Sequence, residues 1–162
     1  MKNRFEFDPE RVSERIRRAA GGKRGSAALS ADDAGELFDR YRESEAHFRA
    51  GAQECLARND DLQAAEKTWG AFAQAIKAAS AVRGRRLDAH FAVIRVAHAL
   101  AEILRDEDPA AADRIKLGLA AAGLMHQHLC ERHLDRDLIR SLSADVDAAL
   151  DVIETRFWRQ AA

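Results

Sequence analysis

The apolar residues of the chain recur every three or four positions over most of its length, a spacing that places side chains on one face of an α-helix. The pattern is clearest between Asp60 and Gly84, where leucine, alanine, tryptophan, phenylalanine and isoleucine form one stripe. Asp60 is a typical N-terminal capping residue and Gly84 a typical helix stop. This segment therefore predicts a long amphipathic helix.

The same periodicity and start signals predict five helices in all. They run from Ser30 to Arg58, from Asp60 to Gly84, from about Leu87 to Arg105, from Asp108 to about His133 and from Asp135 to about Phe157. No segment carries the period-two alternation of a strand. Because the connections between helices are short, successive helices should pack antiparallel. We therefore expect an all-α fold, an antiparallel five-helix up-and-down bundle.

The predicted core consists of the large side chains on these stripes: Trp69, Phe72, Ile76, Phe91, Ile94, Leu119, Leu142, Val146 and Ile153. The stripe of the first predicted helix is interrupted by Ser44 and Glu45. These two polar residues are either edge positions of the bundle or part of a binding site. The third predicted helix is apolar over a wide arc, so we expect it to be buried on more than one side.

The first 29 residues differ from the rest, with eight lysines or arginines against four acids. Asp8 and Pro9 can start a short helix there, and Gly21 can end it. The chain thus divides into a basic N-terminal arm and linker over residues 1–29 and a helical bundle domain over residues 30–160. The arm is either solvated and partly mobile or a basic segment that contacts RNA or another partner.

Composition supports a helical protein of the cytoplasm. Hydrophobic residues make up 47% and charged residues 33% of the chain, with only 2 prolines and 9 glycines. The formal net charge of -1 does not favour nucleic-acid binding. No apolar stretch has the length of a membrane span, and the N-terminus lacks an apolar signal core. We expect the two cysteines, Cys55 and Cys130, to be reduced and buried.

Three segments together resemble a known family. They are AAEKTWGAFAQAIKA at residues 64–78, an RG…H pattern ending in Gly84 and His90, and AGLMHQHLCERHL at residues 122–134. With them, roughly residues 31–158 resemble the PaREP family of small helical proteins, within the wider HEPN superfamily. Residues Met125, His128 and Cys130 depart from the family's pattern. The resemblance implies a HEPN-like up-and-down bundle that is often dimeric, and it implies little about activity.

The superfamily resemblance also implies candidate site residues. Many members are ribonucleases that use an arginine followed, after four to six residues, by a histidine. Arg85 and His90 match this spacing as catalytic candidates, because the chemistry needs a cation for the phosphate and an imidazole for proton transfer. The alternative is a basic loop followed by a histidine at a helix start. Candidate binding residues are Arg83, Arg86, Glu45 and His126.

A second group of chemically competent residues is His126, Cys130 and His133. Their spacings of four and three place them on one helix face, where they could serve as metal ligands. His126 and His133 also lie on the apolar stripe, which favours core histidines over ligands. We therefore predict neither a bound metal nor another cofactor, with these three residues as the alternative metal site.

The sequence favours a non-catalytic helical-bundle protein of the PaREP/HEPN type that binds partners and forms a homodimer. A nucleotidyltransferase-type protein is a second candidate partner, RNA is not favoured, and a membrane is excluded. The alternative is a metal-independent ribonuclease or a nucleotide-binding, toxin-like component of a toxin–antitoxin or defence system. A dimer-related cleft that joins His90 to arginines would favour the enzyme. An isolated His90 packed under Trp69 would favour the binding protein.

Overall fold

The computed structural model describes residues 8–22 and 24–159, and these residues form six helices and two short strands. The helices are α1 (Pro9–Ala20), α2 (Ala31–Ala57), α3 (Asp61–Ala81), α4 (His90–Leu104), α5 (Pro109–Glu131) and α6 (Arg136–Phe157). The strands are β1 (Ser26–Ala28) and β2 (Arg85–Leu87). The expected all-α class is confirmed, and no helix in the described ranges is long and apolar enough to cross a membrane.

Side-chain caps fix where most of the helices begin. The carboxylate or hydroxyl oxygens of Asp8, Ser30, Asp60, Asp108 and Asp135 each accept a hydrogen bond from a backbone N–H two or three residues further on. These bonds satisfy donors that a helix start leaves unpaired. The predicted starts of α2, α3, α5 and α6 are therefore confirmed, whereas α4 begins after Ala89 without a side-chain cap.

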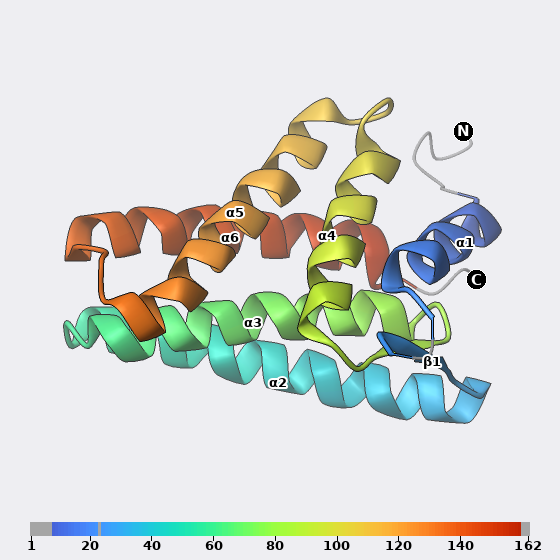
Figure 1. The fold of residues 1–162 in the computed structure, drawn as a ribbon, viewed down its shortest axis with the longest axis horizontal. Coiled ribbons are helices and arrows are strands. Elements are labelled where there is room, and N and C mark those ends of the chain that lie inside the picture. Colours follow the sequence, from blue (N-terminus) through green and yellow to red (C-terminus); the bar gives the residue numbers. More distant parts are fainter. Residues whose placement is uncertain (1–7, 23, 160–162) are drawn as a thin grey trace.

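The helices do not form a simple up-and-down bundle. Figure 1 shows α2, α3 and α6 running along the long axis of the molecule, while α4 and α5 form a hairpin that rises steeply from them. Helix α3 contacts α2, α4, α5, α6 and β2. Its many buried alanines allow neighbours to approach from several directions. The alanine-rich stripe thus marks the central helix of the fold.

Two strands occur where the sequence predicts none. Ser26 pairs with Leu87 and Ala28 with Arg85 in an antiparallel ladder. Gly84, with φ of 72°, turns the chain out of α3 directly into β2. Three-residue strands are too short to show alternation, and their pairing joins distant segments. The predicted start of the third helix near Leu87 is therefore wrong, because Leu87 ends β2 and α4 begins at His90.

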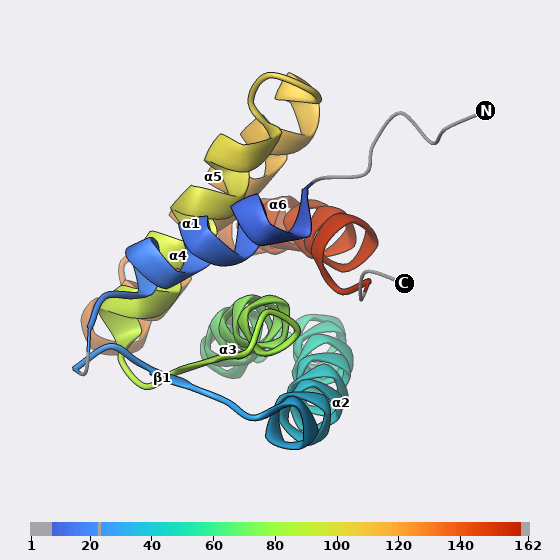
Figure 2. The same cartoon turned by 90° about the vertical axis from the view of Figure 1, so that its right-hand side faces the viewer.

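The N-terminal helix is part of the packed structure. Helix α1 lies along α4 in Figure 2, and the two helices are in contact. Val12, Ile16 and Ala20 on α1 are buried in the common hydrophobic core. Three apolar residues spaced four apart are enough to form a continuous buried stripe. The alternative of a solvated, partly mobile arm is therefore wrong for residues 9–20.

Most of the predicted core residues are in or beside the core. Leu119 of α5 is partly buried and packs against the core. Six others, on α3 and α6, are buried in the core or packed against it: Trp69, Phe72, Ile76, Leu142, Val146 and Ile153. Phe91 and Ile94 are exposed instead. Helix α4 is covered by α1, α3 and α5 but remains open on its outer side. A wide apolar arc therefore does not mean full burial here.

Candidate functional site

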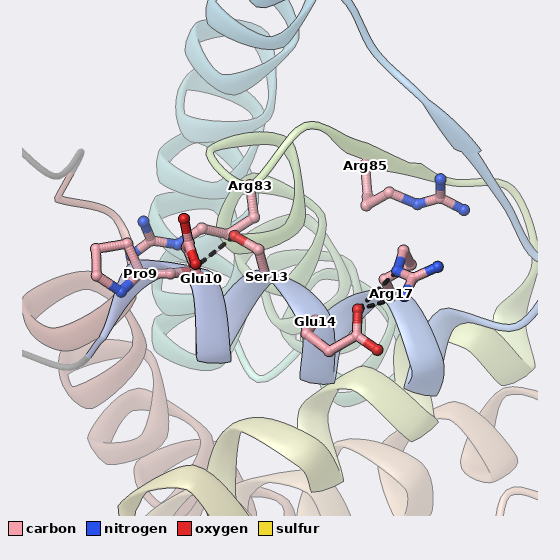
Figure 3. Close-up of a pocket in the computed structure, with 7 residues that line it drawn as sticks. All are labelled: Pro9, Glu10, Ser13, Glu14, Arg17, Arg83 and Arg85. Atoms are coloured by element: carbon pink, nitrogen blue, oxygen red, sulfur yellow. Dashed lines mark hydrogen bonds and ion pairs between the residues drawn. The ribbon is translucent and has the colours of Figure 1, made fainter.

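A groove of about 340 Å³ runs between α1 and the connection from α3 to β2 (Figure 3). Its lining consists of Pro9, Glu10, Ser13, Glu14, Arg17, Arg83 and Arg85. Figure 3 shows Arg83 beside the first turn of α1 and Arg85 nearer its last turn, with their guanidinium groups pointing apart. Two of the arginines that the sequence singles out thus line one groove at separate places.

The alternation of side chains along β2 separates Arg85 from Arg86. Successive strand residues point to opposite faces. The Nη2 group of Arg85 donates to the hydroxyl of Ser26 at 2.6 Å, and the buried Ser26 hydroxyl donates to the Gly21 carbonyl at 3.0 Å. Arg86 is exposed and pairs with Asp88 at 2.7 Å. Of the two residues, only Arg85 belongs to the groove.

Two of the three groove arginines, Arg83 and Arg85, form no ion pair within the described part of the chain. The buried Nε atoms of Arg83 and Arg85 have no hydrogen-bond partner there, and Arg83 forms no ion pair there. Burial lowers the pKa of the Arg83 guanidinium. In contrast, Arg17 is bonded to Glu14. Because a half-buried cation without a counter-ion is unfavourable, this end of the groove favours an anion.

A second cluster consists of three aromatic rings, one from each of three helices, that lie in mutual contact. Trp69 of α3 lies 4.7 Å from His90 of α4 and 4.9 Å from His126 of α5, measured between ring centroids. The two imidazoles are stacked at 4.9 Å with 29° between their planes. Burial, followed by the nearby His126, lowers the pKa of His90. His90 therefore packs against Trp69, as one of the two alternatives expects, but it is not isolated, because it also stacks on His126.

The candidate catalytic pair has no direct contact. Arg85 is held in the groove by Ser26, whereas His90 stacks on Trp69 and His126. No hydrogen bond or ion pair joins Arg85 to His90 in the described ranges. The sequence spacing holds, but the strand end and the turn at residues 88–89 lead the two side chains to different neighbours. Their catalytic role stays a prediction.

The alternative metal ligands His126, Cys130 and His133 do not form a cluster that could bind a metal ion. In residues 8–22 and 24–159, no group of three histidine, cysteine or acidic side chains is placed to hold a metal ion. Helix α5 ends at Glu131, and the left-handed Arg132 (φ 51°) takes His133 off the helix face. His126 and His133 are exposed, so their prediction as core histidines is wrong. The buried histidine is His128, whose Nδ1 accepts the Leu134 N–H.

Glu45 lies in a charged network that joins α2 to α6. It is 3% exposed, and one of its oxygens lies 4.0 Å from Arg49 Nη1. Arg49 also pairs with Asp147, Asp151 and Glu154 of α6, at 2.9, 2.7 and 3.3 Å. Burial, and next the charge of Glu154, raise the pKa of Glu45 to about 7. Sequence reasoning finds Glu45 as a polar break in a stripe but misses the acidic residues of α6 in its network, which lie about a hundred positions away.

Comparison with known proteins identifies the family. Neither the curated proteins nor the solved structures include a match. The model of the Archaeal PaREP1/PaREP8 family matches residues 39–151, well over half of the chain. The match runs from α2 into α6 and includes Trp69, His90 and His126, while α1 and β1 lie outside it. The wider HEPN placement stays a prediction. The chain belongs to the archaeal PaREP1/PaREP8 family.

Proposed function

We propose that this chain is a non-catalytic binding protein whose first partner is a second copy of itself, docked through the α4–α5 hairpin. One observation carries the proposal. Four large hydrophobic side chains of the hairpin are exposed: Phe91 by 44%, Ile94 by 39%, Leu117 by 53% and Leu124 by 39%. The fifth such residue in the described ranges is Leu138 of α6, at 42%.

These side chains lie in stripes on both helices of the hairpin. Phe91 and Ile94 are three residues apart on α4, and Leu117 and Leu124 are seven apart on α5, so each pair shares one side of its helix. The hairpin rises from the three long helices (Figure 1), and α1 also packs on its α4 helix. Several exposed apolar side chains on one hairpin are typical of an interaction site, and a two-fold dimer can bury the same stripes on both copies.

The site chemistry supports binding over catalysis. A metal-independent ribonuclease needs a cation and a proton-transfer group at one phosphate. Arg85 is bonded to Ser26, whereas the exposed His90 ring stacks on His126 and lies tilted against Trp69. We therefore expect incubation with structured and single-stranded RNA to leave both intact. Cleavage that His90→Ala abolishes in a folded protein would instead favour the ribonuclease alternative.

Light scattering with size exclusion at micromolar concentration tests the self-association. The expected mass is twice the 18.0 kDa of the chain. Leu124→Arg and Leu117→Arg should each give a monomer, because a buried unpaired charge opposes docking. Leu138→Arg is the matched control, since Leu138 is equally exposed but lies on α6. A monomeric parent, or a control variant that dissociates just as the others do, would contradict the proposal.

A further inference from the structure

We propose that the groove along α1 is a binding site for a polyphosphate chain, with Arg83 and Arg85 each holding one phosphate group. The proposal rests on the groove alone and does not depend on self-association. One wall of the groove is α1, which lies outside the segment that matches the family. The family match therefore covers Arg83 and Arg85 but not the α1 wall of the groove.

The charge of the groove favours an anion. The lining residues comprise three arginines and two glutamates, a net charge of +1. Glu14 is already neutralised, because both Arg17 and Arg18 bond to it. Glu10 is exposed and forms no ion pair with Arg83 or Arg85 in the described ranges. Two half-buried guanidinium groups thus remain for an external anion, and only one unpaired carboxylate competes with it.

The arrangement of the two arginines selects an extended ligand. In Figure 3 their guanidinium groups lie toward opposite ends of α1 and point apart, with Ser13 on the helix between them. Two cations that point apart favour an anion with more than one charged group, such as a chain of linked phosphates lying along α1. The groove volume of about 340 Å³ is at the lower end of the range for small-molecule sites.

Arg85 is positioned before any ligand arrives. Its Nη2 donates to Ser26, which is buried and in turn donates to the Gly21 carbonyl. The β1–β2 ladder holds Ser26 opposite Leu87, two residues along the strand from Arg85. Because these bonds already restrict the guanidinium, less conformational entropy is lost when an anion binds. Arg83, which has no such partner, gains its counter-ion only on binding.

Isothermal titration calorimetry of the full chain with sodium triphosphate, in EDTA and low salt, tests the proposal. We expect saturable binding that weakens as NaCl is raised. Arg83→Met and Arg85→Met should each weaken it about tenfold or more, because each removes charge-assisted hydrogen bonds. Arg86→Met is the matched control on the opposite face of the same strand and should bind like the parent. Glu10→Gln should bind more tightly, since it removes the competing carboxylate.

ATP in a parallel titration distinguishes the source of the phosphate chain. Equal affinity for triphosphate and ATP would assign the site to the phosphates alone, and tighter ATP binding would add a nucleoside contact. Circular dichroism and thermal melting check that each variant folds. If Arg85→Met unfolds because it loses the hydrogen bond to Ser26, the effect of Arg83→Met alone decides the test. Three results would overturn the proposal: no saturable binding of either compound, equal weakening by Arg86→Met, or binding of an RNA oligonucleotide alone.

Discussion

Glu45 is the residue whose environment departs furthest from its ordinary solution state. Its carboxyl group is buried and faces Arg49 on its own helix and Asp147, Asp151 and Glu154 on α6. Those four neighbours already carry a net negative charge, so ionisation of Glu45 adds to an acidic surrounding. Burial and this repulsion favour the protonated form, which raises its pKa to about 7 from an ordinary value of 4.5.

The raised pKa of Glu45 predicts a pH dependence of stability with a definite sign. The folded state holds the proton more tightly than the unfolded chain, so the free energy of unfolding falls as pH rises from 4.5 to about 7. Glu45→Gln keeps the shape and removes the ionisation. Relative to this variant, the parent should lose about 2–3 kcal/mol between pH 5 and pH 8.

Urea unfolding of both proteins across that range measures the difference. His90, whose pKa is lowered, acts in the opposite sense, because stability is lost as pH falls through its lowered pKa. That contribution is common to both proteins and cancels in the comparison. Parallel pH profiles of the parent and the Gln variant would refute the assignment of Glu45.

At the scale of elements, the helices could be predicted because their signals are local. Asp60, Asp108 and Asp135 cap helices within three residues of themselves, and the apolar period is visible in any helical window. The β1–β2 ladder could not be predicted, since it joins residues 26–28 to residues 85–87. The steep rise of the α4–α5 hairpin likewise depends on side-chain shapes at the helix crossings.

The packing of α1 on α4 predicts that the N-terminal helix contributes to global stability. Ile16 is fully buried against the core. Ile16→Ala should lower the free energy of unfolding by about 2–4 kcal/mol, through lost burial and a residual cavity. Arg15→Ala, at the exposed neighbouring position, should change it by less than about 0.5 kcal/mol. Denaturant unfolding monitored by circular dichroism would show equal midpoints for the two variants if α1 were a free arm.

The crossing of α5 over α6 depends on a missing side chain at Gly118. A Cβ atom at this position would lie 2.2 Å from the Cβ of Ala149, closer than atoms can approach. Gly118→Ala should therefore destabilise the fold by about 1–3 kcal/mol, because the helices must move apart. Gly123 lies on the same helix with open space around it, so Gly123→Ala should stabilise by up to about 1 kcal/mol. Thermal melts that rank the two variants in the reverse order would contradict this packing.

At the scale of the whole molecule, function depends on which segments the fold brings together. Arg83 and Arg85 are recognisable as candidate binding residues because they are close together in the sequence. The opposite wall of their groove is α1, about 70 positions earlier, and no local pattern indicates that contact. The sequence could offer the contact of His90 with Trp69 only as one alternative, and it could not indicate the approach of His126, since the three rings come from three helices. The periodicity of the sequence therefore predicts the helices and points to candidate site residues. The contacts between helices and strands determine which of those residues can act together.

The proposed dimer joins two copies of the chain through their α4–α5 hairpins. Hydroxyl-radical footprinting with mass spectrometry tests it most directly, because it reports the solvent exposure of individual side chains. Between dilute and concentrated protein, the labelling of Leu117 and Leu124 should fall at the higher concentration, while that of Leu138 stays constant. Unchanged labelling of Leu117 and Leu124 in a sample that light scattering shows to be dimeric would place the interface elsewhere and contradict the claim.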